Sequence, residues 1–211
     1  MSSVQILGAP VSTFVRVVRI VAEEKEVPYE LVPLGPHTPD VDALHPFGRI
    51  PVLRHGDVTL CESRAIACYL DRRFDGPSLV PADTLEQARV EQWISLILTG
   101  FDPVLVRAYL LAYVFPGTEN GQPDRARIDA TLPQLERCLD VLGRAVGPTG
   151  QLVGSSFTLA DAYLIPILAY LKDMPESGRL IADSEALRDY IARQEARPSV
   201  RATVPPPMAA G

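Results

Sequence analysis

The sequence predicts an α/β domain followed by an all-helical domain. Residues 1–75 mix short β-type runs with helical segments, whereas residues 83–197 show helical periodicity almost throughout. Residues 76–82 are rich in glycine, proline and serine, which favours a linker between the two regions. The chain has 211 residues, 47% of them hydrophobic, which suffices for one large domain or two small ones. We therefore expect domains at 1–75 and 83–203 and a proline-rich tail at 204–211.

Charge and cysteine content exclude several classes of partner and site. The formal net charge is −6 and no Lys/Arg cluster occurs, so we expect neither a nucleic acid nor a membrane as a partner. Cys61, Cys68 and Cys138 form no C-x-x-C pair, so neither a dithiol redox centre nor a metal site is expected. The N-terminus lacks a signal-peptide pattern, and no uninterrupted apolar run approaches the ~20 residues that span a bilayer. These features predict a cytoplasmic protein.

The elements of the first domain follow from its apolar pattern. We expect a strand at 4–7, a helix from Thr13 to about Lys25 with one buried face, and a second strand at 29–34. The intervening helix makes these two strands parallel. A hairpin at 52–61 turns at Gly56-Asp57, and a helix follows at 63–74. The order β-α-β-(α)-β-β-α is that of a thioredoxin-like domain.

The second domain is predicted from helical spacing alone. One long helix covers about 85–115 and should bend near Gly100 to Pro103, because proline cannot donate the helical hydrogen bond. A second covers about 124–146, where six apolar residues recur at alternating spacings of four and three and form a packing seam. A third begins at Thr158, which forms a capping box with Asp161. The last spans 184–196.

The loop between the first strand and the first helix carries the first candidate functional residue. Ser12 lies at the expected N-terminus of the helix, where backbone N–H groups and the helix dipole favour an anion. Its hydroxyl can add one more hydrogen bond, for example to a thiolate. Such a serine can also be only an N-cap, which is its commoner role when the loop is taken alone.

Two further pairs of residues suit an amino-acid-like ligand. Ile50-Pro51 directly precedes a strand, and a cis bond there would leave the Ile50 N–H and C=O free to pair with a peptide. An ordinary trans proline opening the strand is the alternative. Ser63 begins a helix and can hold a carboxylate, while Glu62 beside it can accept a hydrogen bond from an ammonium. Taken alone, this pair is also typical of a helix cap preceded by a surface acid.

In combination these features are far more specific. The strings HPFGRIP at residues 45–51 and ESRAI at residues 62–66 resemble the glutathione-binding domain of glutathione transferases. Ser-Thr at 12–13 looks like the serine-using phi class and its bacterial relatives. Further matches are EQW at 91–93, TLAD at 158–161 and RPSV at 197–200. The resemblance spans nearly the whole chain and is weaker between about residues 100 and 150.

The resemblance implies a thioredoxin-like domain plus an all-helical domain, with glutathione as co-substrate. It implies that Ser12 donates a hydrogen bond to the glutathione sulfur. Ile50 would pair with the cysteinyl backbone through a cis bond to Pro51, and Glu62 and Ser63 would bind the γ-glutamyl end. No activating histidine is evident near Ser12 in the sequence, so we expect it to act as a donor and not as a nucleophile.

Two residues of the implied glutathione site depart from the family pattern. Arg49 stands where phi enzymes often have Gln or Lys. His37 falls where a Lys commonly binds the glycyl carboxylate, and a neutral imidazole binds a carboxylate less well. Both are expected to contact that end of glutathione, with an affinity that differs from the family norm.

The resemblance also implies a homodimer. Phe47 lies in a loop between Pro46 and Gly48, and burying a phenylalanine is worth roughly 1.5–3 kcal/mol. In related enzymes this loop lies at the subunit interface. We therefore expect a C2 dimer in which Phe47 inserts against the partner's helices of about 85–115 and 124–146. The alternative is that Phe47 packs within its own chain.

The sequence as a whole predicts a glutathione transferase that adds the thiolate to a hydrophobic electrophile. One alternative is a binding or assembly module of the same fold without catalysis. Another is a glutathione-dependent peroxidase, isomerase, dehalogenase or etherase. The pattern does not identify the electrophile. Candidate walls for its pocket, each more often ordinary packing, are Val11, Leu34, Tyr109, Tyr113 and Phe115.

Overall fold

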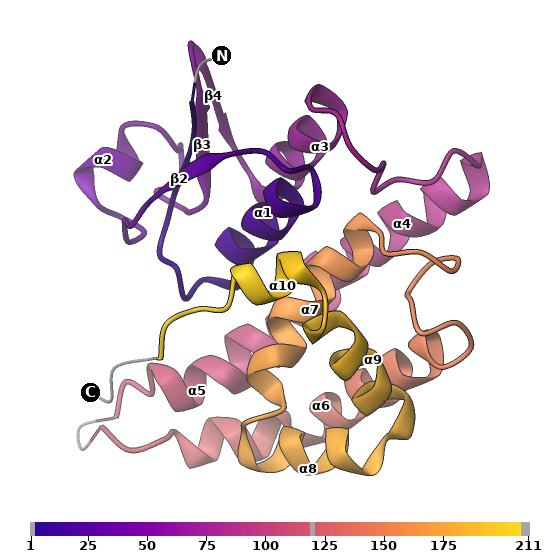
Figure 1. Ribbon diagram of the computed structural model, residues 1–211. Helices are drawn as coiled ribbons and strands as arrows, with labels where there is room; N and C mark the ends of the chain where they lie inside the picture. The colour runs from indigo at the N-terminus through magenta and orange to yellow at the C-terminus, as the bar shows by residue number, and fades with distance from the viewer. Residues whose placement is uncertain (1–2, 119–120, 208–211) are drawn as a thin grey trace. The chain divides into compact units, whose positions relative to one another are not determined.

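The computed structural model describes residues 3–118 and 121–207, and they form two compact units (Figure 1). The first unit reaches from the N-terminal region to Val80 and takes in the chain again from Glu195, and the second spans Pro81–Gln194. The first boundary falls within the expected linker at 76–82. The second differs from expectation, because the residues from Glu195 to 203 group with the first unit instead of the helical one.

A four-stranded mixed sheet forms the centre of the first unit. Its strands are β1 (Val4–Leu7), β2 (Tyr29–Val32), β3 (Val52–His55) and β4 (Val58–Cys61), in the order β2-β1-β3-β4. β1 and β2 are parallel, as predicted, and the other two pairings are antiparallel. β2 ends at Val32, two residues earlier than expected. This sheet and its helices confirm the thioredoxin-like arrangement.

The strand register brings the loops of the first unit together. Leu7, the last residue of β1, lies opposite Val52, the first residue of β3. Val52 in turn lies opposite Cys61, the last residue of β4. The loop after β1, the segment before β3 and the residues after β4 therefore emerge at the same end of the sheet.

Four helices accompany the sheet: α1 (Thr13–Glu24), α2 (Pro39–Asp42), α3 (Ser63–Arg73) and α10 (Pro198–Ala202). α1 buries an apolar face that includes Val17 and Ile20, and it packs against α3 and α10. Its strong amphipathic pattern is the reason that the prediction located it within one residue.

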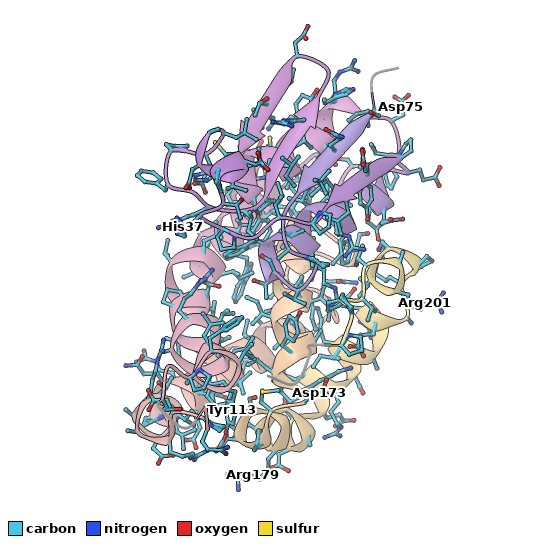
Figure 2. The ribbon with its side chains drawn as sticks, turned by 90° about the vertical axis from the view of Figure 1, so that its left-hand side faces the viewer. His37, Asp75, Tyr113, Asp173, Arg179 and Arg201 are labelled. Atoms are coloured by element: carbon cyan, nitrogen blue, oxygen red, sulfur yellow. The ribbon has the colours of Figure 1, made fainter. Side chains whose placement is uncertain are left out.

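Polar contacts explain why the C-terminal segment belongs to the first unit. The Arg197 guanidinium donates to both carboxylate oxygens of Glu24 on α1, at 3.0 and 2.8 Å. Arg16 and Arg19 of α1 donate to backbone carbonyls of residues 200–203 at the end of α10. The bidentate pair of Arg197 and Glu24 is of the strong and geometrically specific kind, whereas the bonds from Arg16 and Arg19 are longer, at 3.2–3.4 Å. Arg201 of α10 is exposed and can be located in Figure 2.

The described residues of the second unit form helices and the segments that connect them. In chain order it contains α4 (Thr84–Leu96), η1 (Ile97–Leu110), α5 (Leu111–Val114), α6 (Arg125–Val146), α7 (Leu159–Leu171), α8 (Pro175–Asp183) and α9 (Glu185–Glu195). Where a bend was expected, η1 is a π-helical stretch around Pro103, which has no N–H to donate. α8 was not predicted. It begins at Pro175, a residue suited to the first helical position.

The core of the second unit confirms two predicted features. Five of the six seam residues of α6 are buried, and the sixth, Leu132, is half-buried. The capping box at the start of α7 is present, with Asp161 fully buried. Its carboxylate accepts hydrogen bonds from the N–H and hydroxyl of Thr158, the Leu152 N–H and the Tyr190 hydroxyl. A buried carboxylate with four donors fixes the start of α7.

The stretch Thr84–Val114 is long and apolar enough to cross a membrane by length and composition alone. It is not an uninterrupted apolar run, because Asp102 and Arg107 lie within it. Within the helical unit, the apolar residues Ile94, Ile97 and Leu105 of this stretch are buried. That placement is typical of the core helix of a globular domain.

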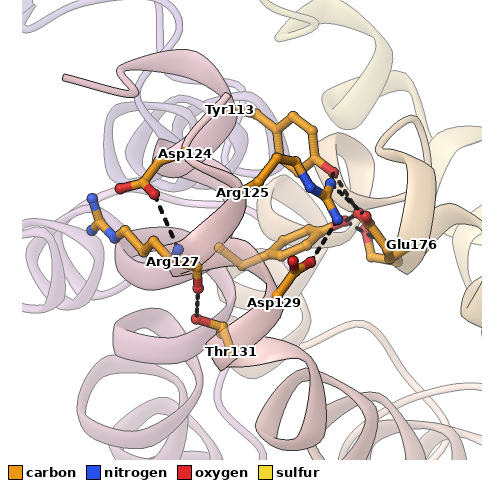
Figure 3. A network of polar contacts seen from close by, with 9 residues as sticks. Tyr113, Asp124, Arg125, Arg127, Asp129, Thr131 and Glu176 are labelled. Atoms are coloured by element: carbon orange, nitrogen blue, oxygen red, sulfur yellow. Dashed lines mark hydrogen bonds and ion pairs between the residues drawn. The ribbon is translucent and has the colours of Figure 1, made fainter. Parts of the chain in front are cut away.

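A network of polar side chains attaches α8 to the rest of the helical unit (Figure 3). The Glu176 carboxylate accepts hydrogen bonds from the hydroxyls of Tyr109 and Tyr113 and from the Arg125 guanidinium. Burial opposes ionisation of Glu176, but these donors outweigh it and lower its pKa to about 2. Tyr109 and Tyr113, considered above as pocket walls, thus direct their hydroxyls into the packing of α8.

The junction of β4 and α3 has an unusual backbone. Glu62 has φ 71° and ψ 115°, a region that sterics disfavour for any residue with a Cβ atom. Residues held in sparsely populated regions cost of order 1–3 kcal/mol and cluster at functional sites. The structure therefore retains a destabilising conformation at the residue that the sequence assigned to ligand binding.

We expect Glu62→Gly to be more stable than Glu62→Ala. Both variants lose the carboxylate, but only glycine lacks the Cβ that makes this φ unfavourable. After allowing for the greater freedom of glycine in the unfolded chain, the net gain is about 1 kcal/mol, or about 2–4 °C in melting temperature. Thermal denaturation followed by circular dichroism measures the difference. Equal melting temperatures for the two variants would contradict the assignment of strain.

Candidate functional site

The candidate residues from three separate segments meet at one end of the sheet of the first unit. The β1–β3–β4 register places the loop that leads to Ser12 beside the segments of Ile50 and Glu62. Gly8 permits this close approach, since a Cβ atom there would lie 2.4 Å from the Val15 side chain and 3.3 Å from Ile50 Cβ. The first loop therefore lies directly against Ile50.

Ser12 is the N-cap of α1. Its Oγ accepts a hydrogen bond from the Val15 N–H at 3.4 Å, which is long for such a bond. Its own N–H donates to the Ala9 carbonyl. Among the residues that the structure describes, none accepts the proton of the Ser12 hydroxyl. Capping uses the oxygen as an acceptor, so the two roles considered for Ser12 are compatible. The half-buried hydroxyl can donate to an anion at the helix N-terminus.

The Ile50–Pro51 peptide bond is cis, as predicted. Pro51 is buried and Ile50 is half-buried, directly before β3. Within the described parts of the chain, neither the N–H nor the C=O of Ile50 makes a hydrogen bond. An extended peptide can pair with both groups, as it would with the edge of a strand.

Glu62 and Ser63 occupy the start of α3. The Glu62 side chain is 65% exposed, and its Oε1 lies 3.5 Å from Nε2 of His45. Ser63 is the first residue of the helix and is buried. An exposed carboxylate next to a helix N-terminus offers an acceptor for an ammonium and backbone donors for a carboxylate. This combination matches the two charged groups of a free amino acid.

His37 and Arg49 lie between β2 and β3, His37 before α2 and Arg49 after it, and both are exposed. The His37 N–H donates to the Gly48 carbonyl at 2.8 Å, which brings His37 next to the segment of Arg49. His37 can be located at the surface of the first unit in Figure 2. Its Nδ1 lies 3.9 Å from the Asp42 carboxylate. That negative charge opposes the binding of a ligand carboxylate at His37, whereas the Arg49 guanidinium favours it.

The sequence did not single out His45 for its own side chain. Its imidazole is buried and connects the loop of Phe47 to Glu62. A histidine just before a Pro-Phe-Gly turn can cap that turn, which is the signal that could have indicated its role. Phe47 itself is 67% exposed, and the Arg49 guanidinium lies 5.8 Å from its ring centroid.

Comparison with protein families gives two matches within the chain. Residues 6–78 match the glutathione S-transferase N-terminal domain, and residues 125–193 match the glutathione S-transferase C-terminal domain. The first match contains all seven candidate site residues. The second covers the chain from α6 into α9.

Individual relatives span almost the full chain. Glutathione S-transferase 3 of Zea mays is 33% identical over 98% of this chain and 98% of its own. A glutathione S-transferase of Silene vulgaris is 31% identical over 96% and 97%. The crystal structure of glutathione transferase F7 from Populus trichocarpa has a TM-score of 0.85 at 27% identity, covering 95% of this chain and 97% of that one.

A bacterial structure is similar as well. The theta-class glutathione S-transferase of Xanthomonas axonopodis pv. citri, solved with glutathione bound, has a TM-score of 0.83 at 29% identity and covers 97% and 98% of the two chains. The two domain matches cover more than half of the chain, and the relatives agree with them over nearly its whole length. The chain therefore belongs to the glutathione S-transferase family, with plant phi-class enzymes among its relatives.

Proposed function

We propose that Ser12 holds the sulfur of glutathione as a thiolate, which then attacks a hydrophobic electrophile. Family membership supplies the class of enzyme and glutathione as co-substrate. The observation that carries the role of Ser12 is its hydroxyl at the N-terminus of α1, with its proton unused among the described residues. The same end of the sheet presents the Ile50 backbone and the Glu62 carboxylate.

The free energy by which Ser12 must stabilise the thiolate relative to the thiol is modest. A free thiol has a pKa near ~8.5, and lowering it by ~2 units takes about 2.7 kcal/mol of preferential thiolate stabilisation. A hydroxyl that donates to a charged acceptor contributes roughly 1.5–3 kcal/mol. The helix terminus adds ~0.3–1 kcal/mol. These two contributions suffice at neutral pH without a general base, so Ser12 acts as a donor and keeps its own proton.

The remaining site residues would hold the rest of the tripeptide. The Ile50 N–H and C=O would pair with the cysteinyl backbone. Glu62 would accept from the γ-glutamyl ammonium, and the start of α3 at Ser63 would receive the adjacent carboxylate. Arg49 and His37 would face the glycyl carboxylate, with Asp42 weakening the contribution of His37. This end of the ligand is therefore held less firmly than the γ-glutamyl end.

The reaction itself is simple once the thiolate is bound. The thiol proton leaves to solvent, and the sulfur lone pair forms the new carbon–sulfur bond. In a substitution on an aryl halide, the halide departs with the electron pair of the broken bond. Ser12 favours the charged thiolate and does not form a covalent bond at any step.

We also propose a C2 homodimer that acts in the cytoplasm. Phe47 is 67% exposed on a loop, although burying a phenylalanine is worth roughly 1.5–3 kcal/mol. Insertion of Phe47 into the partner's helical unit would recover this free energy twice in a symmetric dimer. The three cysteines are all free thiols, which suits a compartment where glutathione keeps thiols reduced.

Ser12→Ala is expected to lose most of the conjugation rate with a model aryl halide while still binding glutathione. The lost hydroxyl donor corresponds to roughly 1.5–3 kcal/mol, or about a 10- to 100-fold fall in kcat. Steady-state kinetics and titration calorimetry measure the two effects. Ser78→Ala, an exposed serine remote from the sheet end, serves as a control with unchanged rate. A Ser12→Ala enzyme with wild-type turnover would reject the donor role.

Phe47→Ala is expected to weaken the dimer. Loss of two buried rings removes about 3–6 kcal/mol, which raises the dissociation constant about 10²- to 10⁴-fold. Analytical ultracentrifugation over a range of concentrations measures it. Val204→Ala is the control, because Val204 is also an apolar residue that is 61% exposed but lies outside the Phe47 loop and outside the helices that Phe47 is expected to contact. A Phe47→Ala protein as firmly dimeric as wild type would reject Phe47 as the anchor.

A further inference from the structure

His45 differs from the other histidines of the chain in its burial and contacts. It is 3% exposed, and both of its ring nitrogens face a polar partner. Nδ1 accepts a hydrogen bond from the Phe47 N–H at 3.0 Å. Nε2 lies 3.5 Å from Oε1 of Glu62, whose side chain is 65% exposed. The imidazole thus connects the interior of the loop to a carboxylate at the surface.

The contact between Nδ1 and the Phe47 N–H determines which ring nitrogen carries the proton, and therefore how Nε2 can interact with Glu62. A backbone N–H is always a donor, so Nδ1 must be the unprotonated nitrogen of the ring. The neutral imidazole then carries its proton on Nε2, which is the nitrogen that faces Glu62. This nitrogen can only donate, and the Glu62 carboxylate can only accept. The two groups are therefore complementary without any charge on His45.

The contact between His45 and Glu62 lies next to the residues that would bind glutathione. The Glu62 side chain has few constraints of its own, since it is 65% exposed. The other partner of His45, Phe47, lies three residues before Ile50 on the same loop. One buried ring therefore joins the loop that leads to Ile50 with the residue that would receive an ammonium.

We propose that His45 is a positioning residue that orients the Glu62 carboxylate toward the γ-glutamyl ammonium of glutathione. The inference rests on the proposed function, in which Glu62 binds that ammonium. His45 touches no reacting atom and acts through Glu62. Its effect is accordingly confined to ligands that carry the ammonium, and it appears in affinity and KM rather than in kcat.

Two variants separate the two nitrogens of the ring. In His45→Asn the amide oxygen can still accept from the Phe47 N–H, but no atom extends to Glu62. In His45→Gln the longer side chain can place an amide N–H near Glu62, while the acceptor for Phe47 is lost. The positioning role predicts the larger loss of glutathione affinity for His45→Asn. A role in the loop alone predicts the larger loss for His45→Gln.

The experiment is a double-mutant cycle with two ligands. Calorimetry measures binding of glutathione, and of the analogue in which hydrogen replaces the γ-glutamyl amino group, to the wild type, His45→Asn, Glu62→Ala and the double variant. We expect His45→Asn to weaken glutathione about three- to tenfold and the desamino analogue less than twofold. In the Glu62→Ala background, His45→Asn should have no further effect. In His45→Asn the KM for glutathione should rise, whereas kcat should stay within about twofold of the wild-type value.

Several outcomes would overturn the proposal. Equal losses for both ligands, or additive effects of the two substitutions, would assign His45 to the fold of the loop alone. Unchanged glutathione affinity in His45→Asn would also assign His45 to the fold of the loop alone. A wild-type protein that binds no glutathione would instead refute the proposed function, so the two failures are distinguishable.

A measurement on the wild type covers the case in which the variants do not fold. Nitrogen NMR shifts of the His45 ring report which nitrogen carries the proton. We expect the form protonated on Nε2, and a change in its Nε2–H signal on adding glutathione that the desamino analogue does not reproduce. Protonation on Nδ1, or the same response to both ligands, would contradict the proposal.

Discussion

The pairing of β3 between β1 and β4 is the constraint on which the rest of the site depends. Side chains alternate along a strand, so a slip of one residue would send every buried side chain to the opposite face. With Leu7, Val52 and Cys61 in line, the end of β1, the start of β3 and the end of β4 coincide. Hydrophobic burial of residues such as Ile6 and Leu53 therefore fixes where Ser12, Ile50 and Glu62 lie.

A site built in this way uses backbone more than side-chain chemistry. Ser12 and Ser63 lie at the starts of helices, and Ile50 offers its main chain, so much of the ligand would meet N–H and C=O groups held by the fold. Such groups are preorganised and lose little freedom on binding. Side chains would contribute as well, namely the Ser12 hydroxyl, Arg49, His37 and the Glu62 carboxylate. Among these, the Glu62 carboxylate is mostly exposed and belongs to a residue with an unfavourable backbone conformation. The buried ring of His45 beside it is consistent with a need for external support.

Local sequence pattern predicted the four strands, the hairpin and the first helix, because alternation and amphipathic spacing survive without tertiary context. The HPFGRIP string at residues 45–51 predicted the cis bond before Pro51 through its resemblance to glutathione transferases. The spacing of apolar residues alone could not predict that bond. Other features depend on contacts remote in sequence. Residues 195–203 join the first unit through Arg197 and Glu24, which are 173 residues apart. The approach of His45 to Glu62 depends on two loops meeting, so neither loop could indicate it alone.

The most direct test of the account is the pKa of the glutathione thiol in the binary complex, followed through the ultraviolet absorbance of the thiolate as pH is varied. We expect a thiol pKa about 2 units below the ~8.5 of a free thiol in the wild type, and a value shifted back toward it in Ser12→Ala. Bound glutathione with the pKa of the free thiol in the wild type, or an equally lowered value without the Ser12 hydroxyl, would contradict it.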